Sequence, residues 1–148
     1  MANKRDKYEQ LLDCSCNKIR SASRKITQLY EGHLREAGIK PTQFTILAAL
    51  ANTGAVLLTE LADTLSLERT GLTRNLTVLE RNGWVQIDTG SEDLRQRIVS
   101  LTPQGLRQLD LTIPYWKKAQ LSVAQELGQD ELTSLRNTLD ALTQTLSD

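Results

Sequence analysis

The spacing of apolar residues changes period twice along this chain, and this change limits the possible folds more than any other feature. Leu72, Leu76 and Leu79 are three or four residues apart, as on one face of a helix. From Val85 to Leu101 apolar and polar residues alternate, as in the strands of a hairpin, and helical spacing then returns. The chain is therefore predicted to be mainly α, with six helices and a two-stranded β-wing between the fourth and the fifth.

Local start and stop signals give approximate bounds for the six helices. Thr102 followed by Pro103 is typical of a helix start, because the hydroxyl accepts from a free N–H group and proline needs no N–H there. Thr59 and Asp130 are expected to cap the third and sixth helices. The expected helices cover about residues 7–36, 41–54, 59–65, 68–82, 103–128 and 130–146.

The composition fits a helical protein of a reducing compartment. The 148 residues, with eight glycines and three prolines, suffice for one domain or for a small reader module joined to a dimerisation scaffold. No run approaches the roughly 18 apolar residues of a membrane span, and the first residues lack the apolar stretch of a signal peptide. Two cysteines are too few for a disulfide scaffold. A cytoplasmic location is therefore expected.

The charge balance argues against nucleic-acid binding. Eighteen basic and eighteen acidic residues cancel, whereas a free-standing nucleic-acid binder is typically basic. Residues 59–100 hold five basic and seven acidic residues, and residues 1–45 hold nine and five. DNA binding by the middle segment would thus depend on individually placed arginines. The neutral charge favours the alternative of a helical dimeric adaptor or scaffold protein without specific DNA binding.

The predicted fourth helix has two different faces. With 100° per residue, the side opposite its leucines is polar and carries Thr70, Arg74, Thr77 and Arg81. Short hydroxyls permit close approach to DNA, and arginines bind guanine edges or phosphates. Gly71 costs about 1 kcal/mol of helix stability relative to alanine, so close contact with DNA would explain it. Without further signals, the same residues are more typical of a solvated helix face.

The hairpin adds a second group of basic residues. Arg95 and Arg97 follow its polar tip, and on alternate positions of a strand both would point the same way. Arginines on such a wing commonly enter the minor groove of DNA. Asp93 is expected to pair with Arg95 and hold it ready for DNA. The simpler interpretation is a surface ion pair of little energetic value.

Together these segments resemble the MarR family of winged helix-turn-helix regulators. The resemblance lies in the run from Leu61 to Val85, including Arg69, Thr70, Gly71, Leu72, Thr73 and Arg74, in the wing Asp93-Leu94-Arg95, and in Leu101-Thr102-Pro103-Gln104-Gly105. Two departures, Glu68 for the usual aspartate and Gly71 for threonine or serine, affect the expected operator sequence. The DNA-binding residues are expected to be Arg69, Thr70, Gly71, Thr73, Arg74, Thr77, Arg81, Arg95 and Arg97.

The resemblance implies a transcription regulator, most simply a repressor, that acts as a homodimer on a palindromic DNA operator and is released by a small molecule or an oxidant. Independently, Leu132, Leu135, Leu139, Leu142 and Leu146 form a heptad seam with no obvious partner in one short chain. The expected division is a helical dimerisation region, residues 1–36 and 103–148, around a DNA-binding domain, residues 37–102.

Cys14 and Cys16 are the candidates for redox chemistry. On one helix, side chains two residues apart point about 200° apart, which disfavours a disulfide between them. Cys16 lies on the apolar stripe and is expected to be buried, while Cys14 is expected on the wetter face. One interpretation is a core cysteine and an incidental surface thiol. The other is an oxidant sensor that forms a bridge to the partner subunit or a mixed disulfide, with Lys18 and Arg20 lowering a thiol pKa.

A pocket for a small ligand is the alternative means by which the protein would sense a signal. Tyr30, His33 and Trp116 are candidates to line it, where the first and fifth helices meet the reader, although His33 is more typically a packed residue. One histidine and two cysteines cannot complete a usual zinc site, and no phosphate loop or nucleophile-base pair is seen. Neither an enzyme nor a metal or other cofactor is therefore expected.

Overall fold

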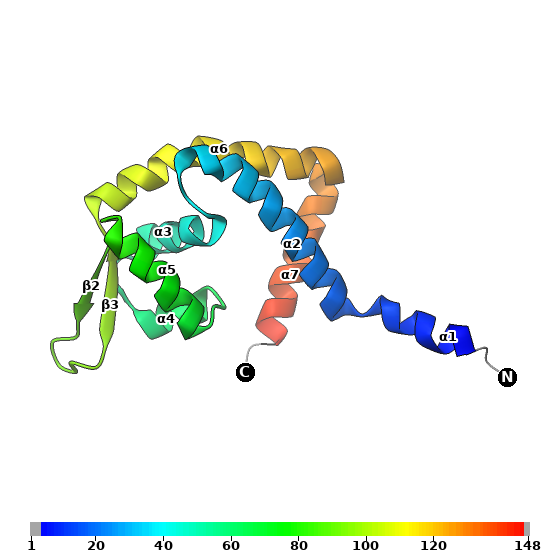
Figure 1. The fold of residues 1–148 in the computed structure, drawn as a ribbon, viewed down its shortest axis with the longest axis horizontal. Coiled ribbons are helices and arrows are strands. Elements are labelled where there is room, and N and C mark those ends of the chain that lie inside the picture. The colour runs from blue at the N-terminus through cyan, green and yellow to red at the C-terminus, as the bar shows by residue number, and fades with distance from the viewer. Residues whose placement is uncertain (1–3, 147–148) are drawn as a thin grey trace.

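The computed structural model describes residues 4–146, which form helices around one small antiparallel sheet (Figure 1). The α-helices are α1 (Lys4–Glu9), α2 (Ser15–Leu34), α3 (Pro41–Thr53), α4 (Leu58–Thr64), α5 (Arg69–Arg81), α6 (Pro103–Leu127) and α7 (Gln129–Thr145). Short 3-10 helices are η1 (Gln10–Asp13) and η2 (Arg35–Ala37), and the strands are β1 (Val56–Leu57), β2 (Val85–Thr89) and β3 (Arg97–Leu101). The predicted mainly α fold with a β-wing is confirmed, with seven α-helices instead of six in the described range.

The predicted single helix over residues 7–36 is wrong. Cys14 has an extended backbone, with φ −70° and ψ 112°, and it separates η1 from α2. An ion pair of 3.0 Å between Lys18 and Asp13 crosses this break. The preceding helix α1 points away from the rest of the molecule (Figure 1). The apolar stripe therefore continues through the break, but the helix does not.

The predicted two-stranded wing is present as β2 and β3. The sheet has a third strand that was not predicted, and the strand order is β1-β3-β2. Val99 of β3 is fully buried and pairs with Val56 on one side and Ile87 on the other. Because residues 56–57 are paired, α4 begins directly after them. Leu57 occupies its N-cap position without a side-chain cap, and Gly128 occupies that of α7. The predicted caps Thr59 and Asp130 are therefore wrong.

The start of α6 follows the predicted signal. The Thr102 hydroxyl accepts a hydrogen bond of 3.0 Å from the Gly105 N–H and donates one of 2.6 Å to the Gly83 carbonyl. The cap thus ties α6 to the end of α5 and to the wing. Helix α6 then continues through Pro114 to Leu127.

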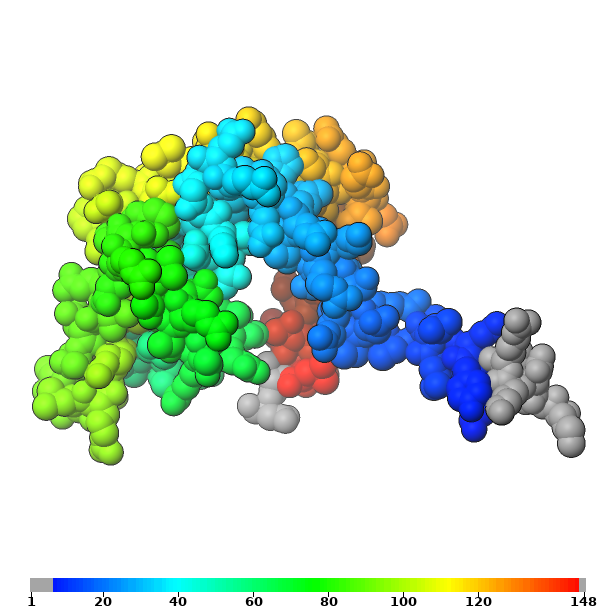
Figure 2. Space-filling view, in the orientation of Figure 1, coloured from blue at the N-terminus to red at the C-terminus, as the bar shows by residue number. Residues whose placement is uncertain are grey.

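The core lies between α3, α4, α5 and the sheet. Its members with at most 1% exposure include Ile46, Leu47, Leu50, Leu61, Leu72, Leu76, Leu79 and Val99. Helices α2 and α6 lie together along one side, and α7 turns back from the end of α6 (Figure 1). Figure 2 shows an opening between α7 and the compact part that holds α3 to α5.

Helices α2, α6 and α7, called the outer helices below, expose many large apolar side chains. Leu135 and Leu139 of α7 are each 40% exposed. The others on α2, α6 and α7 include Ile19, Ile26, Leu111, Leu121, Leu127 and Leu142, and the exposed Leu146 follows α7 directly. No described helix is long and apolar enough to cross a membrane. The division into residues 37–102 and the two flanking ranges stays a prediction, and residues 1–3 and 147–148 lie outside the described part.

Candidate nucleic-acid interface

Helix α5 has the two faces that its sequence indicates. Its leucines are buried, whereas the opposite row is exposed: Thr70, Arg74, Thr77 and Arg81. Arg69 and Thr73 are exposed as well, and Gly71 is half-buried. The helix therefore presents a continuous polar surface to whatever approaches it from outside.

Helix α4 and helix α5 are joined by a tight turn. Ser66 has a positive φ of 51°, and the Leu67 N–H donates a hydrogen bond of 2.9 Å to the Ala62 carbonyl. The half-buried Leu67 anchors the turn on the core. This short connection fixes the direction of α5 relative to α4, as in a helix-turn-helix unit.

The polar groups on α5 differ in how far they are already engaged. Thr77 donates its hydroxyl to the Thr73 carbonyl at 2.9 Å, and Asn75 donates its amide to the Gly71 carbonyl at 2.9 Å. Within the described chain, the guanidinium groups of Arg74 and Arg81 are in no hydrogen bond or ion pair. These two arginines are therefore free to bind an external anion or base edge.

Packing within the chain does not require the glycine at position 71. A Cβ atom built on Gly71 meets no heavy atom within 4 Å, apart from its own helix backbone and sequence neighbours. The described chain therefore gives no packing reason for a residue that weakens a helix at this position.

Asp93 organises the tip of the wing. Its Oδ1 accepts hydrogen bonds from the Arg95 main-chain N–H at 3.0 Å and from Arg95 Nε at 3.4 Å. The predicted pair between Asp93 and Arg95 is thus present. Because the Arg95 side chain is 93% exposed, the pair contributes little stability and leaves the guanidinium accessible.

The expected alternation of Arg95 and Arg97 along a strand is wrong. Arg95 lies in the turn before β3, because the Gln96 N–H donates to the Asp93 carbonyl at 3.1 Å and closes the tip early. Arg97, the first residue of β3, donates from Nη1 to the carbonyls of Leu94 at 3.1 Å and Gln96 at 3.3 Å. Arg97 therefore braces the wing, while Arg95 extends from it.

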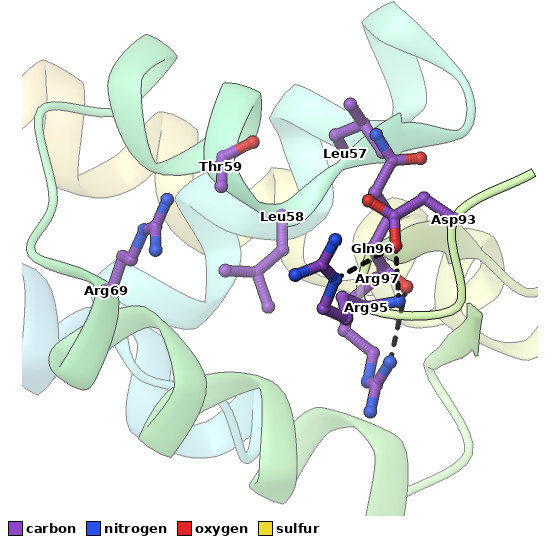
Figure 3. Close-up of a pocket in the computed structure, with 8 residues that line it drawn as sticks. All are labelled: Leu57, Leu58, Thr59, Arg69, Asp93, Arg95, Gln96 and Arg97. Atoms are coloured by element: carbon purple, nitrogen blue, oxygen red, sulfur yellow. Dashed lines mark hydrogen bonds and ion pairs between the residues drawn. The ribbon is translucent and has the colours of Figure 1, made fainter. Parts of the chain in front are cut away.

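A cavity of about 430 Å³ lies between the wing and the start of α5 (Figure 3). Arg69 faces it from the start of α5, and Arg95 and Arg97 face it from the wing. Leu57, Leu58 and Thr59 form the wall between them, with Asp93 and Gln96 completing the lining. Three arginines against one aspartate make this cavity attractive to a phosphate group.

The sequence analysis did not predict that Arg69 lies beside the wing. It also did not predict that residues 57–59 line the cavity between them. The wall exists because Leu57 of β1 pairs with Ile98 of β3. This pairing joins residues 41 positions apart, and a two-residue strand has no alternation to reveal it. No local signal could have indicated the cavity.

The three predicted pocket residues are engaged within the protein. The Tyr30 hydroxyl donates a hydrogen bond to Gln120 Oε1 on α6, and His33 Nε2 lies 3.2 Å from the Ser122 hydroxyl. The Trp116 ring stacks on Phe44, with ring centroids 5.9 Å apart. None of the three lines the cavity beside the wing. Partial burial raises the pKa of the Tyr30 phenol, and the nearby Arg136 opposes part of this shift.

Both cysteines are exposed in the chain, so the expected burial of Cys16 is wrong. The stripe on which Cys16 lies at the start of α2 is not covered by another described element. Cys14 lies outside the helix, so the 200° argument against a bridge between the two does not apply. The described residues contain no group of three or more histidine, cysteine or acidic side chains that could hold a metal ion.

A helix-turn-helix unit followed by a β-wing, with free arginines on the second helix, defines a winged helix-turn-helix DNA-binding protein. Comparisons with known proteins agree. Residues 37–96 match the model of the MarR family. The chain is 30% identical over 94 residues to the HTH-type transcriptional regulator YwoH of Bacillus subtilis, covering 64% of this chain and 68% of YwoH.

Two further comparisons are informative. The multiple antibiotic resistance protein MarR of Salmonella typhimurium is 32% identical over 87 residues, which cover 59% of this chain and 60% of that protein. The crystal structure of the M. tuberculosis regulator MosR in complex with DNA superposes with a TM-score of 0.80 at 34% identity, covering 89% of this chain and 95% of MosR. The chain belongs to the MarR family of transcription regulators.

Proposed function

We propose that the protein is a repressor that binds a palindromic operator as a homodimer. The carrying observation is that the polar face of α5 and the wing arginines are exposed. In addition, an apolar surface on α2, α6 and α7 is left uncovered by the described residues 4–146. A two-fold dimer through that apolar surface would place two α5 helices about 34–36 Å apart, one turn of DNA. A cytoplasmic location fits binding to operator DNA.

Each α5 would enter the major groove with Thr70, Gly71, Thr73, Arg74, Thr77 and Arg81. Arg95 would reach the flanking minor groove, with Asp93 supporting it. Arg69 and Arg97 would bind the phosphate between them, since both face the cavity beside the wing.

The first prediction separates base reading from electrostatic attraction. Arg74→Ala should cost about 1–3 kcal/mol of operator affinity and relax sequence preference, because a bidentate contact to guanine is lost. Arg95→Ala should weaken all DNA similarly and reduce the salt slope by about one. Fluorescence anisotropy measures both effects, using an operator selected from a random duplex pool and a scrambled control. Lys117→Ala, which removes an exposed cation of α6, serves as the matched control.

If Arg74→Ala lowers the affinity for operator and for scrambled DNA equally, Arg74 contacts phosphate and does not read a base. The competing function is a dimeric adaptor without specific DNA binding, which the zero formal net charge favours. If selection yields no preferred sequence and all binding vanishes as salt rises, the adaptor is the better description.

Release from the operator would follow a small ligand or an oxidant. The exposure of both thiols removes the argument that Cys16 is protected by burial. Hydrogen peroxide can oxidise two thiols to a disulfide while it is reduced to water, and Cys14 can supply one sulfur from outside helix α2.

We expect mild peroxide treatment to weaken operator binding of the wild type by roughly tenfold, a coupling usual for allosteric proteins, with recovery in dithiothreitol. The Cys14→Ser, Cys16→Ser double variant should bind the operator normally and ignore peroxide. Loss of operator binding by the double variant under peroxide would exclude the cysteines as the sensor. Unchanged binding by the oxidised wild type would leave a ligand as the signal.

A further inference from the structure

Leu94 places an apolar side chain at the tip of the wing, where polar turn residues are usual. The side chain is 73% exposed, and among residues 37–102 no other large apolar side chain is exposed. Most of the other exposed ones in the described chain lie on the outer helices, where the proposed dimer would cover them. The tip of the wing projects away from those helices (Figure 1), so the dimer gives no reason for Leu94.

The tip is a β-turn whose two central residues are Leu94 and Arg95. The Gln96 N–H donates to the Asp93 carbonyl at 3.1 Å, which is the hydrogen bond that closes a four-residue turn. Aspartate is favoured at the first position, because its carboxylate accepts from the main chain two residues on, here from the Arg95 N–H at 3.0 Å. Leu94 and Arg95 therefore leave the wing from adjacent positions of one turn.

Further contacts hold this turn in place. The Gly90 N–H donates to the Gln96 carbonyl at 3.1 Å, and Arg97 Nη1 donates to the Leu94 carbonyl at 3.1 Å. Gly90 is buried, and a Cβ atom there would lie 2.7 Å from the Asp93 carbonyl oxygen, so the two sides of the loop pack directly on each other. The main chain of Leu94 is thus fixed before any partner binds, and little loop freedom is lost on binding.

We propose that Leu94 enters the minor groove together with Arg95 and makes the wing select A·T over G·C base pairs. The inference rests on the proposed function, which places Arg95 in that groove. Because the two residues are neighbours in one rigid turn, Leu94 reaches the groove wherever Arg95 does. Apolar side chains are a common means by which proteins bind the minor groove.

The chemical basis is the amino group of guanine. Both kinds of base pair present acceptors in the minor groove, but G·C adds the N2 amino donor, which projects from the groove floor. A leucine side chain has no acceptor, so it would cover this donor without satisfying it, and a buried unsatisfied donor is costly. The acceptors are common to both pairs, so their burial does not discriminate. Arg95 supplies the attraction, and Leu94 supplies the discrimination.

The test uses the full-length protein and an operator selected from a random duplex pool. The base pairs that flank each half-site are replaced, one position at a time, by A·T, G·C or inosine·C. Inosine is guanine without the N2 amino group, so its pair keeps the major-groove edge of G·C but not the minor-groove donor. At one flanking position or more, G·C should lower wild-type affinity by about tenfold relative to A·T, and inosine·C should restore it to within about twofold. Fluorescence anisotropy measures the affinities.

Leu94→Ala should reduce this tenfold G·C penalty to about twofold or less, because the methyl groups that cover the amino group are lost. Leu12→Ala is the matched control, since Leu12 is 75% exposed on η1, far from the wing (Figure 1). This variant should keep the full penalty. Arg95→Ala should weaken binding to all three duplexes, because it removes a charge and not the apolar cover.

Three results would overturn the role of Leu94 and keep the proposed function: operator binding without a G·C penalty at any flanking position, inosine·C binding as weakly as G·C, or an unchanged penalty in Leu94→Ala. The last result would assign the preference to groove width sensed by Arg95. A Leu94-dependent penalty on a single half-site that binds as tightly as the palindrome would keep the contact and reject the dimeric operator. If selection yields no preferred sequence and the three duplexes bind alike, both proposals fail.

Discussion

Replacing Gly105 by alanine is expected to destabilise the protein by about 2–3 kcal/mol or more, because it overpacks a contact between α6 and the wing. A Cβ atom at this position would lie 2.0 Å from the Trp84 carbonyl oxygen and 2.8 Å from the Trp84 carbonyl carbon. Both are main-chain atoms directly before β2, so they cannot move without shifting the strand. The Thr102 N–H also donates to this Trp84 carbonyl at 3.1 Å.

Gly71→Ala is the matched control. It makes the same substitution in a helix, where the new Cβ meets no atom within 4 Å, so it should stabilise the fold by roughly 0.5–1 kcal/mol. Urea denaturation followed by circular dichroism, at one protein concentration for all variants, gives the midpoints. A midpoint of Gly105→Ala equal to that of the wild type would show that the backbone at Trp84 yields easily, contrary to this packing argument.

The sequence predicted the elements whose signals are local. The faces of α5 follow from one helical period, and the start of α6 follows from Thr102 and Pro103. The Asp93–Arg95 pair was also predictable, because its partners are two residues apart. In each case the interaction that decides the structure lies within a few neighbouring residues.

The sequence failed where distant pairing or an absent signal decides the structure. Strand β1 is too short to show alternation, and its pairing with β3 both starts α4 early and builds the wall of the arginine cavity. The break at Cys14 interrupts a stripe whose apolar spacing continues on both sides. Periodicity reports which residues share a face if a helix forms, but not whether the helix is continuous.

The buried Gln43 illustrates a further limit. Gln43 occupies a buried position of α3, where the helical pattern predicts an apolar residue. Its Oε1 accepts a hydrogen bond of 3.1 Å from the Lys40 N–H, at the three-residue spacing of a capping box that a sequence can show. The partner of this buried polar side chain is therefore local, whereas its burial follows only from the fold.

The Leu135→Glu, Leu139→Glu double variant is expected to be monomeric or unfolded and to lose operator binding. Both side chains are 40% exposed on α7, and they lie one turn apart on the same face. In the proposed dimer they would be buried, and placing two carboxylates in an apolar interface costs several kilocalories per mole each. A monomer presents one α5, so it loses the simultaneous contact with two half-sites.

Thr133→Glu, Asn137→Glu provides a control with the same added charge on the opposite face of α7, where both residues are exposed. This variant should remain dimeric and bind the operator. Sedimentation velocity measures the assembly state, circular dichroism reports folding, and anisotropy reports operator binding. A wild-type protein that sediments as a folded monomer, or a Leu135→Glu, Leu139→Glu variant that stays dimeric, would contradict the proposed interface. Loss of operator binding in both variants would attribute the effect to charge on α7 and not to dissociation of the dimer.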